Sequence, residues 1–209
     1  MIDQIRSTLN DNLSRVESLV NTYEHHPDVQ GWQGRKRADL LDILRAGVVL
    51  LHASLEDVLR SIARWRLPSA NADVLNEIPL VGQRGTNPKK FSLGDLTAFR
   101  GKTVDNIFAE SVEAHLERSN YNSTNEISKL LNDVGIETAK VNAKFAELQA
   151  LMDRRHQIVH RADRQDEVQG SGDHKIRGIN KYEVRAWAEA VREFSKTVFT
   201  ELEKLYPAY

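Results

Sequence analysis

The sequence predicts an all-α protein: four long helices in an antiparallel-type bundle, with a segment of short helices inserted between the second and the third. Two observations predict this fold. Apolar residues recur at three- and four-residue steps over four long stretches, and alternating apolar runs bounded by turns, the signature of strands, are missing. The chain has 209 residues, enough for one core. We therefore expect a single domain over residues 1–209, with residues 68–135 as an insertion within it.

The first two long helices are predicted before the insertion. The first carries its apolar residues at Ile2, Ile5, Leu9, Leu13, Val16, Val20 and Tyr23, and Pro27 follows it. The second covers residues 36–65 and stops at Pro68. Gly47 lies inside this second helix, which indicates that another helix packs closely against it.

Capping signals mark the elements that follow. The insertion is rich in turn residues and then contains two short helices, the second of which opens with a capping box of Ser123 and Glu126 and stops at Gly135. The third long helix is predicted over residues 137–162. The fourth opens with a capping box of Asn180 and Glu183 and runs to residue 207.

Composition excludes several classes of function. The formal net charge is −1 with 28% charged residues, so any site for a polyanion must be local. The absence of cysteine removes disulfides, thiolate metal sites and cysteine nucleophiles. A phosphate-binding glycine loop and the turn of a serine hydrolase are also missing. With no signal peptide and no apolar run long enough to span a bilayer, we expect a soluble, cytoplasmic protein without a membrane partner.

The third long helix ends in the basic segment "DRRHQIVHR", residues 153–161. On a helical wheel Arg155 falls in the middle of the apolar stripe, between Met152 and Val159, where a guanidinium needs a partner. Glu56, which follows His52 by one turn on the second helix, is a candidate partner. Three interpretations remain open at this point: a structural ion pair, an arginine whose charged end reaches solvent at the end of the helix, and an arginine that acts on a phosphate.

The spacing of His156 and His160 raises the question of a metal site. Two histidines four residues apart on a helix can share one metal ion. However, Gln157 stands where the zinc proteases have their glutamate, and no third ligand is evident. We therefore predict no metal and no cofactor.

The segment RHQIVH, residues 155–160, resembles the R-x4-6-H signature of the HEPN superfamily, with a polar residue after the arginine and a place at the end of a late helix. The segment "VLLHASLEDVLRSI", residues 49–62, is similar to the second helix of the larger HEPN proteins that occur with RNA repair and defence genes. The resemblance covers the second to fourth long helices and leaves residues 68–135 unexplained. It implies that the chain is a HEPN-like helical domain.

The resemblance also implies an activity, which is metal-independent cleavage of RNA by a homodimer. Arg155 would stabilise charge on the scissile phosphate and His160 would transfer protons, which gives a 2′,3′-cyclic phosphate and a 5′-hydroxyl. Supporting residues are expected at four positions: His156, Glu56, Arg154 and Arg161. Arg155 and His160 lie about 140° apart on one helix, so they converge only if a second copy contributes.

The biological setting that the resemblance implies is a toxin or an antiviral defence effector. Its partners would then be the RNA substrate, a second copy of the chain, and a cognate antitoxin or neighbouring defence protein. Two alternatives stay open. One is a non-catalytic HEPN-like module that binds RNA or a protein, and the other is a structural bundle in which Arg155 pairs with Glu56.

Overall fold

The structure is a computed structural model, which describes residues 1–30, 38–82, 93–163 and 177–207. All regular elements in these ranges are helical, so the predicted all-α class is confirmed. The α-helices are α1 Ile2–Glu24, α2 Ala38–Arg66, α3 Ala72–Leu75, α4 Val104–Leu116, α5 Thr124–Asp133, α6 Phe145–Arg161 and α7 Lys181–Leu205. Short 3-10 helices cover Leu67–Ser69, Leu93–Phe99, Thr138–Lys140 and Asn142–Lys144.

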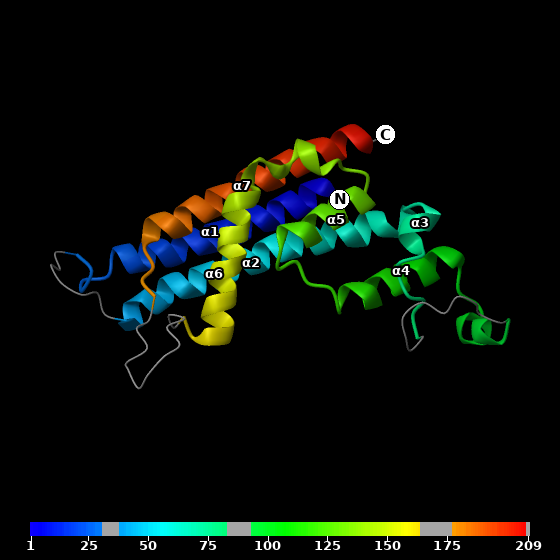
Figure 1. Cartoon of the computed structure of the whole chain (residues 1–209), viewed down its shortest axis with the longest axis horizontal. Helices are drawn as coiled ribbons and strands as arrows, with labels where there is room; N and C mark the ends of the chain where they lie inside the picture. Colours follow the sequence, from blue (N-terminus) through cyan, green and yellow to red (C-terminus); the bar gives the residue numbers. More distant parts are fainter. Residues whose placement is uncertain (31–37, 83–92, 164–176, 208–209) are drawn as a thin grey trace.

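Three long helices, α1, α2 and α7, lie side by side along the length of the molecule (Figure 1). The predicted apolar face of α1 is buried from Ile5 to Tyr23, because a helix that runs along the bundle keeps one face on the core. α2 contacts α1, α4, α5, α6 and α7 and is the central helix. A Cβ atom at Gly47 would lie 3.6 Å from Val184 on α7, in agreement with the close packing predicted there.

The fourth long element, α6, runs across the other three instead of along them (Figure 1). It begins at Phe145, eight residues later than the predicted start at residue 137. Two 3-10 turns precede it, and Val141 between them has φ −128° and ψ 0°, which no α-helix contains. The sequence there includes Thr138, Val141 and Asn142, whose helix propensity is low.

α4, from the segment predicted as an insertion, packs at the C-terminal end of α2 (Figure 1). Arg64 on α2 forms a bidentate ion pair with Glu113 on α4, with distances of 2.6 and 2.8 Å. Arg60, one turn earlier, donates to the carbonyls of Leu116 and Ser119 and so satisfies the end of α4. The capping boxes predicted at the starts of α5 and α7 are both present.

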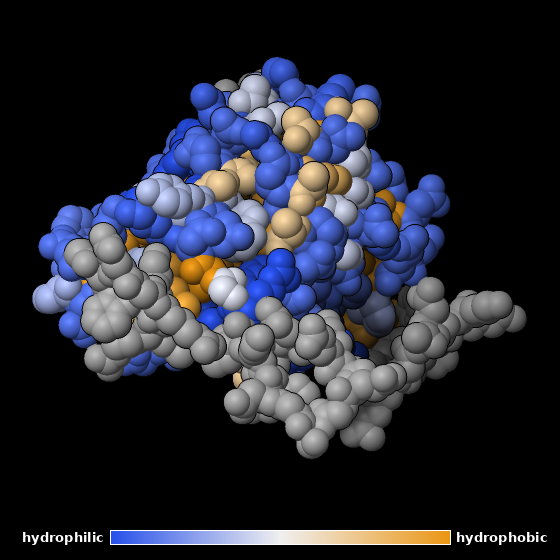
Figure 2. Space-filling model, turned by 60° about the vertical axis from the view of Figure 1, so that its left-hand side comes forward, coloured by the Kyte–Doolittle hydropathy of each residue, from blue (hydrophilic) through white to orange (hydrophobic). Residues whose placement is uncertain are grey.

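The surface is mostly polar on the side drawn in Figure 2, where apolar side chains appear as small separate groups between hydrophilic ones. In the described part of the chain, no helix is long and apolar enough to cross a membrane.

Candidate active site

The C-terminal end of α6, where the sequence places the site, has an unusual backbone. Ala162 and Asp163 both have left-handed angles, with φ values of 46° and 58°. The N–H of Asp163 donates a 3.0 Å hydrogen bond to the carbonyl of Gln157, which closes the last turn. Left-handed backbone costs about 1 kcal/mol or more for a residue with a Cβ atom, less for aspartate than for alanine. Other contacts must therefore hold this end in place.

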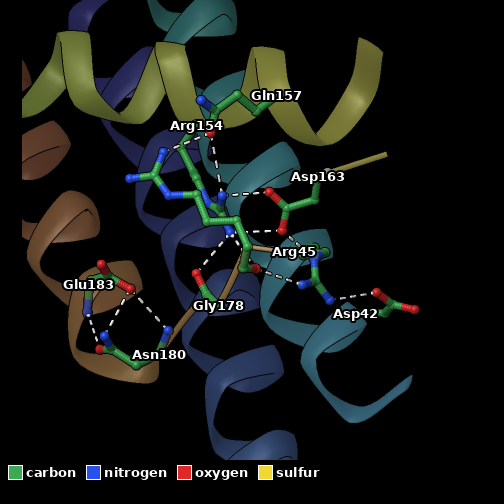
Figure 3. A network of polar contacts seen from close by, with 9 residues as sticks. Asp42, Arg45, Arg154, Gln157, Asp163, Gly178, Asn180 and Glu183 are labelled. Atoms are coloured by element: carbon green, nitrogen blue, oxygen red, sulfur yellow. Dashed lines mark hydrogen bonds and ion pairs between the residues drawn. The ribbon is translucent and has the colours of Figure 1, made fainter. Parts of the chain in front are cut away.

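A buried ion-pair network supplies those contacts (Figure 3). The side chain of Asp163 is 1% exposed and lies between Arg154 on α6 and Arg45 on α2. Arg154 Nη2 and Arg45 Nε each lie 2.7 Å from Asp163 Oδ2. Arg154 Nη1 lies 2.5 Å from Oδ1 of the same carboxylate. The end of α6 is thus bound to the central helix.

Backbone groups of residues 177 and 178 complete the network. The carbonyl of Arg177 accepts from Arg45 at 3.0 Å and from Arg154 at 3.2 Å, and the carbonyl of Gly178 accepts from Arg154 at 3.1 Å. In return, the N–H of Arg177 donates to the carbonyl of Asp163 at 2.8 Å. The segment that leads into α7 is therefore fixed against the end of α6.

The side chain of Arg154 is fully engaged in this network. Burial lowers the pKa of Arg154 from its ordinary value, and the negative charge of Asp163 opposes that shift. Its side chain is 4% exposed and both terminal nitrogens are engaged, so it is not available to a substrate. Arg154, which the sequence predicted as a supporting residue, holds the end of α6 through this network.

Arg155, the next residue, is in a different situation. It is half-buried, and within the described residues its guanidinium makes no hydrogen bond or ion pair. Arg155 lies on α6, which packs against α2, and its charge acts on His52 of α2, whose side chain is 1% exposed. Burial is the main reason that the pKa of His52 is lowered; Glu56 opposes this shift, and the positive charge of Arg155 adds to it. Arg155 is thus the arginine of the motif that makes no polar contact with the described residues.

The ion pair considered between Glu56 and Arg155 does not form in the described structure. The carboxylate of Glu56 instead lies 3.8 Å from Nδ1 of His52 and 3.6 Å from Nη2 of Arg60, and it accepts a hydrogen bond from the N–H of Tyr121 at 3.4 Å. Both His52 and Arg60 lie one turn from Glu56 on α2, which brings their side chains next to its carboxylate. The partner that the sequence suggested for Arg155 is occupied elsewhere.

His156 and His160 lie on the solvent side of α6. Both are exposed, and their ring centroids are 4.7 Å apart with an interplanar angle of 41°. Among the described residues no group of three potential ligands surrounds them. Arg161 is also exposed at the helix end. Arg155 and His160 therefore point to different sides of one helix, as their spacing predicts.

The predicted apolar stripe of this helix is correct only over its first half. Leu148, Leu151 and Met152 are buried, but Val159 is 47% exposed. In the last turns Ile158 still packs against the core while Val159 beside it is exposed, so the buried face of α6 differs from the stripe predicted on the wheel. A wheel assumes one constant buried face, and this assumption fails for a crossing helix.

Sequence reasoning missed Asp163 and Arg45, which fix the helix end. Arg45 and Asp163 lie 118 residues apart in the chain, and no local sequence pattern predicts their contact. One signal was present, since two adjacent arginines on an amphipathic helix differ by about 100° in direction and need different surroundings. Lys89 and Lys90 of the segment TNPKKF are two lysines that could contact an RNA backbone, and they lie outside the described residues.

The sequence of the whole chain was compared with known proteins. The family model described as RiboL-PSP-HEPN matches residues 10–204. The chain belongs to the HEPN superfamily. The match includes α2, α6 and α7, and it also extends over the inserted residues that the motif alone did not explain. No curated protein and no solved structure matches the chain.

Proposed function

We propose that this HEPN protein is an endoribonuclease that cleaves RNA without a metal ion. The observation that carries the proposal is the uncommitted guanidinium of Arg155, placed in the family motif beside an arginine that is fully engaged. A planar guanidinium with free donors can bind two phosphate oxygens at once. Arg155 would therefore stabilise the charge that develops on the scissile phosphate.

His160 would carry the proton transfers. The 2′-hydroxyl of the preceding nucleotide attacks the phosphorus, its proton passes to an imidazole, and the 5′-oxygen of the next nucleotide leaves with a proton. The products are a 2′,3′-cyclic phosphate and a 5′-hydroxyl. The exposure of His160 leaves its ring accessible to an RNA strand.

A second copy of the chain would complete the site. Arg155 and His160 of one chain point to different sides of α6, so a twofold pairing of α6 helices would bring an arginine of one copy toward the histidine of the other. Val159, a 47% exposed apolar residue between them in sequence, favours such a contact. RNA and a second copy are the partners that we propose.

The test is a gel assay on RNA of defined sequence in a buffer that contains EDTA, with the wild type beside His160→Ala. We expect cleavage by the wild type, 2′,3′-cyclic phosphate ends, and loss of cleavage in the variant. Binding of RNA without cleavage would support the non-catalytic module instead. Activity that disappears in EDTA and returns with zinc or manganese would show that the reaction depends on a metal.

A further inference from the structure

His52 is a buried histidine that the proposed reaction does not use. It lies on α2 among fully buried neighbours, Val48 one turn before it and Leu55 and Leu59 after it. Its Nε2 atom is buried and has no hydrogen-bond partner within the described structure. A buried polar atom without a partner is costly, so its retention in a hydrophobic core needs a reason.

The surroundings of His52 define its protonation. Nδ1 lies 3.8 Å from a carboxylate oxygen of Glu56, and the backbone of Tyr121 also favours a ring N–H. Burial and the nearby Arg155 disfavour the doubly protonated ring and keep it neutral. A neutral imidazole carries one N–H and one lone pair. With the proton on Nδ1, facing Glu56, Nε2 carries the lone pair and is an acceptor that lacks a donor.

The missing donor is present on the facing helix. Arg155 on α6 approaches His52 closely enough for its charge to act on the ring, and its five N–H donors are without partners among the described residues. An acceptor without a donor on α2 and a donor group without an acceptor on α6 thus lie on two helices that pack against each other.

We propose that His52 is the positioning residue of Arg155. Nε2 accepts a hydrogen bond from the guanidinium when RNA is bound, and this bond fixes the plane of the fork that holds the scissile phosphate. Glu56 keeps the acceptor side of the ring toward Arg155. This inference rests on the proposed ribonuclease function, since positioning matters only if Arg155 binds phosphate.

Two substitutions of His52 separate positioning from packing. His52→Phe keeps the ring shape and removes both nitrogens, so the fold should be as stable as the wild type or more stable. We expect kcat for RNA cleavage to fall roughly 10- to 100-fold, with little change in KM. His52→Gln places an acceptor near the position of Nε2 and should restore most of the rate. If His52→Phe does not fold, His52→Leu serves in the same comparison.

A double-mutant cycle decides whether the effect passes through Arg155. In an Arg155→Ala background, His52→Phe should cause no further loss of cleavage. An equal loss in both backgrounds would show that His52 acts elsewhere. A fall in kcat that follows a fall in melting temperature would assign His52 to packing, and an unchanged kcat in His52→Phe would overturn the proposal.

A third measurement needs RNA binding but no cleavage. Long-range nitrogen NMR spectra of the labelled wild type are recorded with and without a 2′-O-methyl RNA, which lacks the attacking hydroxyl. The Nε2 resonance of His52 should shift on binding in the wild type and stay fixed in Arg155→Ala. A wild type that binds this RNA without the shift would contradict the positioning role. If natural RNA is bound but not cleaved, the ribonuclease proposal fails while this spectrum still tests the contact.

Discussion

Two neighbouring arginines on α6 have opposite fates. Arg154 is 4% exposed and binds the carboxylate of Asp163 and two backbone carbonyls. Arg155 is half-buried and has no polar partner in the described part of the chain. Two adjacent residues at one helix end therefore differ in whether their charge is neutralised by the fold. One cation stabilises the fold, and the adjacent cation makes no polar contact with the described residues, as the proposed binding of phosphate requires.

The largest expected effect tests the structural half of this comparison. Asp163→Asn keeps a residue that tolerates left-handed backbone but removes the charge that Arg154 and Arg45 share. Two buried guanidinium groups then lack a counterion, and the free energy of unfolding should fall by about 3–5 kcal/mol. Urea unfolding measures the loss. Asp153→Asn, at an exposed position of α6, is the control and should change stability by less than about 0.5 kcal/mol. Similar curves for both variants would break the comparison.

The next effect tests the functional half. Arg155→Lys retains the charge but loses the planar fork, so we expect normal folding and cleavage reduced by a factor of about 100 or more. We expect the reverse for Arg154→Lys. Its melting temperature should fall because the buried network is weakened, and the molecules that remain folded should cleave RNA at the normal rate. The measurements are thermal melting and the gel assay on the same RNA. A lower melting temperature in Arg155→Lys, with activity in proportion to the folded fraction, would mean that Arg155 is structural.

The sequence predicted the parts of the fold that depend on local order. The buried residues of α1, from Ile5 to Tyr23, followed from periodicity alone, because that helix lies along the bundle. The place of the candidate motif followed from the resemblance to the HEPN family. The start of α6 and the exposure of Val159 did not follow, since both depend on how the helix crosses its neighbours. The pairing of Asp163 with Arg45 joins positions 118 residues apart, which no single-sequence pattern encodes.

A smaller effect concerns the outer face of α6, where the proposed dimer contact lies. Val159→Glu puts a charge at the centre of a twofold contact, and the two copies would repel each other. We expect dimerisation to weaken at least about 10-fold, or roughly 1.4 kcal/mol. Sedimentation across a concentration series provides the measurement. Val104→Glu, at an apolar position of α4 that is 62% exposed, should leave assembly unchanged. Equal sedimentation of Val159→Glu and the wild type would place the contact elsewhere.

The smallest expected effect tests how much the left-handed backbone of Ala162 costs at the end of α6. Ala162 has φ 46° at the end of α6, where glycine adopts the same angles without a steric cost. Ala162→Gly relieves about 1–2 kcal/mol of local strain and loses part of this gain because glycine makes the unfolded chain more flexible. We expect a net gain of about 0.5–1 kcal/mol, or a rise of about 2 °C in melting temperature. Ala150→Gly, at an exposed position inside α6, is the matched control and should lower stability by about 1 kcal/mol. Cleavage should not change in Ala162→Gly, because the Asp163 network still holds the helix end. A loss of cleavage at higher stability would show that the strained end, and not the network alone, sets the position of Arg155.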